Sequence, residues 1–266
     1  MEPVPVRLVA TDLDGTIVRS DGTISDRTAK ALARVEEAGA AVVLVTGRPP
    51  RSIHPVAEAT GHHGVAICSN GAIIYDLHDE QIIESFMIPV PTVVEVVEIL
   101  RAAMPELAYA VETGHDVYRS HGYRGGWITS PENDQASFPI DDVVKYEAAK
   151  LLASHPTMDV DELLDRTRDL ICHLVEPTHS NGRRLLEMGA LGVSKATTLA
   201  RFAKELGVEA KDVVAFGDMP NDLPMLAWAG TAYAVANAHP LVLEAVSLTT
   251  DSNDDDGVAK VLEQLF

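Results

Sequence analysis

The segment 12–16, Asp-Leu-Asp-Gly-Thr, holds the side chains of this sequence best suited to chemistry. Asp12 and Asp14 are one residue apart, and Gly15 allows the chain to turn directly after them. One carboxylate of such a pair can attack phosphorus to form an acyl phosphate, while the other gives and takes a proton. Two carboxylates repel an anionic ester, so this chemistry needs a cation beside them.

Three further polar segments complete the groups that phosphoryl transfer requires. Thr46, followed by Gly47, offers a hydroxyl and neighbouring backbone N–H groups to phosphate oxygens. Lys195 supplies a point charge that can neutralise the phosphoryl group. Asp218 adds a carboxylate for a hard divalent cation, and Mg²⁺ is favoured because it keeps few protein ligands and binds substrate phosphate.

Each of these segments follows a predicted strand or opens a predicted helix. Short apolar, β-branched runs at 6–11, 40–45, 65–68 and 213–216 are typical of parallel strands buried on both faces. Helical stretches alternate with them, which predicts a Rossmann-like, doubly wound α/β sheet. Ligands bind at the carboxyl edge of such sheets, so we expect the polar segments to meet there.

The middle of the chain has a different pattern of polar and apolar residues. It alternates polar and apolar residues near 109–118 and 171–176, as antiparallel strands do, and predicts a helix at 159–168. We therefore expect a catalytic core made of residues 1–80 and 189–266. An α+β cap domain is expected to be inserted between them at 81–188.

The four motifs, in this order, resemble those of the haloacid dehalogenase-like phosphatases. The resemblance is greatest to the Cof-type branch, which has a large cap of class IIB between the second and third motifs. It implies Asp12 as nucleophile, Asp14 as acid/base and Lys195 as the catalytic cation. It also implies further roles for residues at matching positions: phosphate binding by Thr46, Gly47, Asn70, Lys195 and Asn221, a magnesium site at Asp12, Asp14 (through its backbone carbonyl) and Asp218, and a supporting position for Asp222.

Some positions depart from the family pattern or leave two interpretations open. Ala196 and Ala236 stand where the family usually has glycine, and neither change removes a chemical group. Arg48 either touches phosphate or pairs with a carboxylate at the sheet edge. Asn237 either contacts phosphate or caps the next helix. A last set either reads the leaving group from the cap or forms an ordinary exposed loop: Arg119, His121, Tyr123, Arg124 and Trp127.

Composition restricts the partners and the compartment. The chain has 40 acidic and 21 basic residues and a formal charge of −19, which repels nucleic acid and anionic lipid. We find no signal peptide or membrane-spanning run, and we interpret Cys68 and Cys172 as buried, reduced thiols. We expect a cytoplasmic protein that acts on a small phosphorylated metabolite. The sequence indicates neither the substrate nor the oligomeric state.

The sequence thus favours a magnesium-dependent phosphatase that hydrolyses small phosphomonoesters through an aspartyl phosphate on Asp12. A phosphomutase of the phosphomannomutase type would use the same intermediate and return the phosphoryl group to a sugar. A third interpretation is a non-catalytic module that binds a phosphorylated ligand. The presence of every expected catalytic group argues against it.

Overall fold

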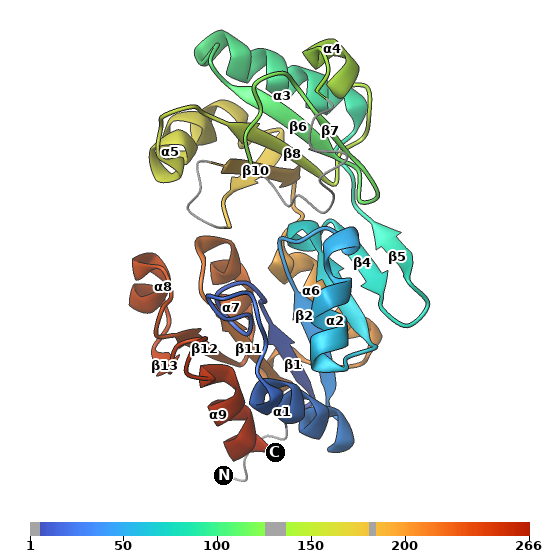
Figure 1. Cartoon of the computed structure of the whole chain (residues 1–266), viewed down its shortest axis with the longest axis vertical. Coiled ribbons are helices and arrows are strands. Elements are labelled where there is room, and N and C mark those ends of the chain that lie inside the picture. Colours follow the sequence, from blue (N-terminus) through green and yellow to red (C-terminus); the bar gives the residue numbers. More distant parts are fainter. Residues whose placement is uncertain (1–5, 126–136, 181–184) are drawn as a thin grey trace.

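A computed structural model describes residues 6–125, 137–180 and 185–266 of the chain. Its larger sheet has eight strands and runs through the lower half of the molecule in Figure 1. In order across the sheet they are β13 (Leu248–Thr250), β12 (Thr231–Val235), β11 (Val213–Gly217), β1 (Leu8–Thr11), β2 (Ala41–Val45), β3 (Val65–Cys68), β4 (Ile73–Asp76) and β5 (Gln81–Ser85). The strands from β13 to β3 are parallel, and β4 and β5 are antiparallel additions.

The first strand of the chain, β1, lies in the middle of the parallel part. It pairs with β11 on one side and with β2 on the other, and all four of its residues are buried. Such a strand has no polar face, which is why its sequence is apolar throughout. The ends of β1, β2, β3 and β11 therefore lie side by side at one edge of the sheet.

Two of the core helices begin at serine caps, as their sequences predict. The Ser25 hydroxyl accepts from the Thr28 N–H at 3.0 Å, and Ser194 accepts from Thr197 at 3.2 Å. Helix α1 packs beside α2 and α9, whereas α6 packs beside α7. The core helices are α1 (Asp26–Glu37), α2 (His54–Thr60), α6 (Lys195–Glu205), α7 (Leu223–Trp228), α8 (Pro240–Ala245) and α9 (Gly257–Leu265).

A second sheet and its helices stand above the first in Figure 1 and pack around a separate apolar cluster. Its five antiparallel strands, in spatial order, are β7 (Val117–Arg119), β6 (Ala108–Glu112), β8 (Lys150–Ser154), β10 (Leu185–Ala190) and β9 (Val175–Thr178). The helices are α3 (Val90–Ala103), α4 (Ile140–Val143) and α5 (Val160–Ile171). We call this part, from α3 to β10, the cap.

The change from one sheet to the other comes a few residues later than each predicted boundary. The strand β5, which begins at residue 81, pairs with β4 in the large sheet, and β10 runs past 188 to Ala190. The strand predicted at 171–176 is wrong over residues 171–174, because Ile171 continues the buried stripe of α5 and the strand begins only at Val175. A few residues of alternation cannot be distinguished from the end of an amphipathic helix.

The described residues include no helix that is long and apolar enough to cross a membrane. Of the two thiols, Cys68 is buried at the end of β3, as expected. Cys172 is exposed just after α5, which corrects the expectation that both are buried.

Candidate active site

Asp12 follows β1 directly and remains part of the sheet. Its backbone N–H donates to the Phe216 carbonyl at 3.0 Å, and its side chain is buried. Gly15 turns the chain with a φ of +83°. A Cβ atom there would lie 2.3 Å from an Asp218 carboxylate oxygen, so the turn requires glycine twice, for its backbone angle and for the close approach.

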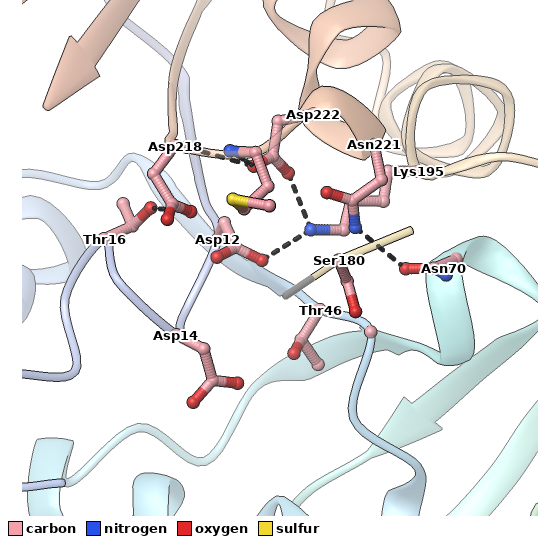
Figure 2. Close-up of polar contacts among 12 residues, drawn as sticks. Asp12, Asp14, Thr16, Thr46, Asn70, Ser180, Lys195, Asp218, Asn221 and Asp222 are labelled. Atoms are coloured by element: carbon pink, nitrogen blue, oxygen red, sulfur yellow. Dashed lines mark hydrogen bonds and ion pairs between the residues drawn. The ribbon is translucent and has the colours of Figure 1, made fainter. Parts of the chain in front are cut away.

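Lys195 contacts both Asp12, which follows β1, and Asp222, which lies in the loop after β11. Its Nζ donates to Asp12 Oδ1 at 2.5 Å and to Asp222 Oδ1 at 2.6 Å (Figure 2). The lysine is the first residue of α6 and is only 1% exposed. Burial opposes its charge, but the two carboxylates outweigh burial and raise the pKa of Lys195. The site therefore holds a permanent buried cation next to Asp12.

Both carboxylate oxygens of Asp222 accept hydrogen bonds from neighbouring groups of the site. One of its oxygens accepts from Lys195, and the other accepts from the N–H groups of Asp218 and Met219 at 3.1 and 3.0 Å. These two amides fix the turn that follows β11. Asp222 therefore contacts both the lysine and the Asp218 backbone.

Three buried carboxylates gather within a few ångströms at this point. Oxygen atoms of Asp12, Asp218 and Asp222 all lie within 4.8 Å of one another. Burial raises the pKa of Asp12 to about 7, against the pull of Lys195 and with the repulsion of Asp222 and Asp14. Burial, followed by repulsion from Asp12 and Asp222, raises the pKa of Asp218 to about 9. The cluster carries more negative charge than one lysine balances, and a second cation would relieve it.

The oxygens of this cluster suit a hard divalent cation such as Mg²⁺. Asp222 already uses both of its oxygens, so Asp12 and Asp218 are the side chains suited to hold the ion. The Thr16 hydroxyl donates to Asp218 at 3.1 Å and orients that carboxylate. Asp14 points away from the cluster in Figure 2, so it suits the ion only through its backbone carbonyl.

The Asp14 side chain forms a two-pronged ion pair with Arg48. The guanidinium donates to the two carboxylate oxygens at 2.8 and 2.5 Å. Of the two interpretations of Arg48, the structure therefore shows the pairing with a carboxylate. Both groups line the same cavity. Asp14 is partly exposed, so a substrate's leaving oxygen can reach it beside Arg48.

The residues expected to bind phosphate lie on the other side of Lys195. Thr46 is buried after β2, and its hydroxyl accepts from the Arg48 N–H at 3.0 Å. Asn70, with a left-handed φ of +58°, accepts through Oδ1 from Asn221 Nδ2 at 3.1 Å (Figure 2). A cavity of about 410 Å³ adjoins these groups and is lined by Asp12, Asp14, Gly47, Arg48, Ser180, Asp218 and Asn221, among others.

Comparison with known proteins identifies the family. Residues 9–262 match the model of the haloacid dehalogenase-like hydrolases. The chain belongs to this family. It is 29% identical over 262 residues to the 5-amino-6-(5-phospho-D-ribitylamino)uracil phosphatase of Bacillus subtilis (strain 168), covering 98% of this chain and 96% of that one. It is 28% identical over 271 residues to the pyridoxal phosphate phosphatase of Escherichia coli (strain K12), covering 96% and 97%.

A solved phosphatase of the haloalkanoate (HAD) superfamily from Bacteroides thetaiotaomicron has the same fold. The TM-score is 0.81 at 24% identity, over 99% of this chain and 96% of the other. The family and the fold class expected from the sequence are therefore confirmed. The individual roles assigned to the site residues remain predictions.

In this haloacid dehalogenase-like hydrolase, some expected residues lie elsewhere or act differently. Asn237 donates to the Gly15 carbonyl at 2.7 Å, and His239 caps the next helix. Asn237 thus supports the turn after Asp14, which neither interpretation of it anticipated. Arg119, His121, Tyr123 and Arg124 are absent from the described lining of the 410 Å³ cavity, and Trp127 falls outside the described residues. Sequence reasoning missed Ser180, which lines that cavity from the cap and follows no recognisable motif.

Proposed function

We propose that this hydrolase is a magnesium-dependent phosphatase that cleaves small phosphomonoesters through an aspartyl phosphate on Asp12. One observation carries the proposal. The buried Asp12 carboxylate contacts the buried Lys195 cation, lies next to Asp218 and lines a cavity of about 410 Å³. A carboxylate held against a cation in this way is placed to attack a phosphoryl group rather than to stabilise the fold.

In the first step, an Asp12 oxygen forms a bond to phosphorus while the bond to the leaving oxygen breaks. For this step Asp14 must carry a proton, which requires its ion pair with Arg48 to open, and it gives that proton to the leaving oxygen in the same cavity. Lys195 neutralises charge on the phosphoryl oxygens and on the aspartyl phosphate, and it stays charged because Asp12 and Asp222 flank it.

In the second step, Asp14 takes a proton from water, whose oxygen attacks phosphorus and releases Asp12 and inorganic phosphate. The hydroxyl of Thr46 and the amide groups of Asn70 and Asn221 hold the phosphoryl oxygens during both steps. Mg²⁺, held by Asp12, Asp218 and the Asp14 carbonyl, would supply positive charge that offsets the negative charge of the ester.

The proposed substrates are small because the cavity has a modest volume of about 410 Å³. Its lining comes from both the large sheet's loops and the cap, through Ser180. This cover by the cap argues against phosphorylated proteins as substrates. The two relatives are named for phosphatase activity on small phosphorylated molecules, which supports hydrolysis rather than transfer to a second sugar.

Magnesium should raise the melting temperature more at high pH than at low pH. The folded-state pKa values of Asp12 and Asp218 lie at about 7 and about 9, above the usual 3.8. The metal-free protein therefore loses stability as pH rises from the usual value through these two values, and protons compete with metal across the same range. We expect a clearly larger Mg²⁺-induced shift at about pH 9 than at about pH 6.

Differential scanning fluorimetry at the two pH values measures this effect. The Asp218→Asn variant is the control, because it keeps the shape of the side chain and removes one proposed ligand. It should show a much smaller shift than wild type. Equal shifts at both pH values, or an undiminished shift in the variant, would contradict the proposed metal site.

The activity itself is tested by phosphate release from a panel of phosphorylated sugars, polyols, nucleotides and pyridoxal phosphate. We expect release with Mg²⁺ and its loss with EDTA, restored by added Mg²⁺. Isomerisation of a hexose 1-phosphate without phosphate release would replace the proposal with a mutase. Absence of both reactions in a folded sample would replace it with a binding role.

A further inference from the structure

A buried ion pair in the cap lies directly over the site. Lys150 of β8 and Glu187 of β10 have side chains only 3% and 2% exposed, and Lys150 Nζ donates to Glu187 Oε2 at 3.1 Å. Burial disfavours the charged form of each side chain, but the opposite charge of its partner outweighs burial. The pKa of Glu187 is therefore lowered and the pKa of Lys150 is raised. Both side chains are therefore charged at neutral pH.

The Glu187 carboxylate contacts the large-sheet part of the chain through Asn70. Asn70 Nδ2 donates to Oε2 at 2.6 Å, and the Ser180 hydroxyl donates to Oε1. The other end of the Asn70 amide accepts from Asn221 Nδ2. One cap carboxylate is thus joined by two successive hydrogen bonds to both amide side chains expected to hold phosphate.

Lys150 reaches the same region from the next strand. Its Nζ donates to the Gly47 carbonyl at 2.7 Å. A Cβ atom at Gly47 would come within 3.1 Å of Asn70 Oδ1 and 3.4 Å of the Ser180 hydroxyl, so this peptide is packed closely against the other members of the network. The lysine therefore fixes the peptide that follows Thr46.

A carboxylate has a property here that an amide lacks. Ionised glutamate only accepts hydrogen bonds, so it forces the Asn70 NH₂ toward itself and the Asn70 oxygen toward Asn221. Asn221 must then present its NH₂ to Asn70. A neutral donor-acceptor group at position 187 would permit both amides to rotate by half a turn, which would exchange the donor and the acceptor that each amide presents to its surroundings.

We propose that Glu187, with Lys150 as its counterion, is a positioning residue that fixes the Asn70 and Asn221 amides and the Gly47 peptide for phosphate binding. The inference rests on the proposed function, because it takes these groups as the phosphate-binding side of the site. A buried ion pair gives little net stability compared with an apolar pair of the same size. An apolar pair could not form the hydrogen bonds that this ion pair forms with Asn70, Ser180 and the Gly47 carbonyl.

The test is the affinity of the full-length protein for inorganic phosphate, measured by calorimetry with Mg²⁺ present. Glu187→Gln should bind phosphate about tenfold more weakly than wild type, the effect of losing one well-oriented hydrogen bond to a charged group. If phosphomonoester hydrolysis is measurable, KM should rise by a similar factor with kcat little changed, as expected for a loss of uniform binding.

Glu112→Gln is the matched control. Glu112 lies in β6, is 2% exposed, and pairs across the cap sheet with Lys150. Its carboxylate contacts Ser69 at 2.7 Å and Arg51 at 3.4 Å, so it also spans cap and core without touching Asn70 or Gly47. Its phosphate affinity should stay near that of wild type. If Glu187→Gln does not fold, the double variant Lys150→Met with Glu187→Leu removes both charges, and it should show the same loss of phosphate affinity.

The outcomes separate this inference from the proposed function. Weaker phosphate binding in Glu187→Gln but not in Glu112→Gln supports the inference, whether or not any substrate of the panel is hydrolysed. Unchanged affinity in Glu187→Gln overturns it, even if wild type is an active phosphatase. Equal weakening in both variants also overturns it, since that would be a general loosening of the cap. A wild-type protein that does not bind phosphate overturns it as well.

Discussion

Asp12→Asn should lower phosphate release by at least about 10³-fold while the protein stays folded. Asparagine keeps the shape of the side chain but cannot form the acyl phosphate. The substitution also removes one of three crowded carboxylates, and the one removed has its pKa raised to about 7 by burial and by the repulsion of Asp222 and Asp14. The free energy of unfolding without metal should therefore be no lower than that of wild type at about pH 8.

Two measurements check this result. Initial rates on the best substrate of the panel give the loss of activity, and acid quenching followed by mass spectrometry should find phosphate on Asp12 in wild type alone. Asp79→Asn is the control, because Asp79 is exposed in the turn between β4 and β5 and should keep full activity. Substantial turnover by Asp12→Asn would show that the nucleophile is another group.

Lys195→Met should cost both activity and stability. The lysine is the only cation shown in contact with Asp12 and Asp222 among the described residues, and all three side chains are nearly inaccessible. Removing one partner of a buried ion pair leaves uncompensated charge, at a cost of about 3–5 kcal/mol. Activity should fall at least about 10³-fold, because the phosphoryl oxygens lose their fixed positive charge.

Urea unfolding at about pH 8 and about pH 5 measures the stability loss, which should be smaller at the lower pH as the carboxylates take up protons. Lys204→Met makes the same change on the exposed face of α6 and should cost no more than about 0.5 kcal/mol. Adding Asp12→Asn to Lys195→Met should recover part of the lost stability. Additive losses in that double variant would refute the coupling of the two residues.

The location of the candidate site could be predicted from the sequence because parallel strands fix where the residues that follow them lie. Apolar runs predicted β1, β2, β3 and β11, and the carboxyl ends of such strands meet at one edge whatever lies between them in sequence. Asp12 and Asp218, which follow β1 and β11, could therefore be expected together although most of the chain lies between them. The cap obeys no such rule, so its helices and strands were predicted only in part.

The residues that sequence reasoning missed owe their position to the docking of cap on core. Lys150 and Glu187 stand in short apolar strands, where a lone charged residue usually points to solvent. They are buried here only because the large-sheet loops at Gly47 and Asn70 lie against them. Neither strand's own sequence contains that information.

The assembly of the site from both ends of the chain bears on how the protein is made. Asp12 leaves the ribosome first, and Lys195 follows 183 residues later. At about 5–20 residues per second this interval is roughly 10–40 s. During that time β1 has its neighbour β2 but not β11, and the Asp12 carboxylate has no lysine. Because β1 cannot bury both edges until β11 is synthesised, the nascent segment that contains β1 should remain a client of chaperones until then.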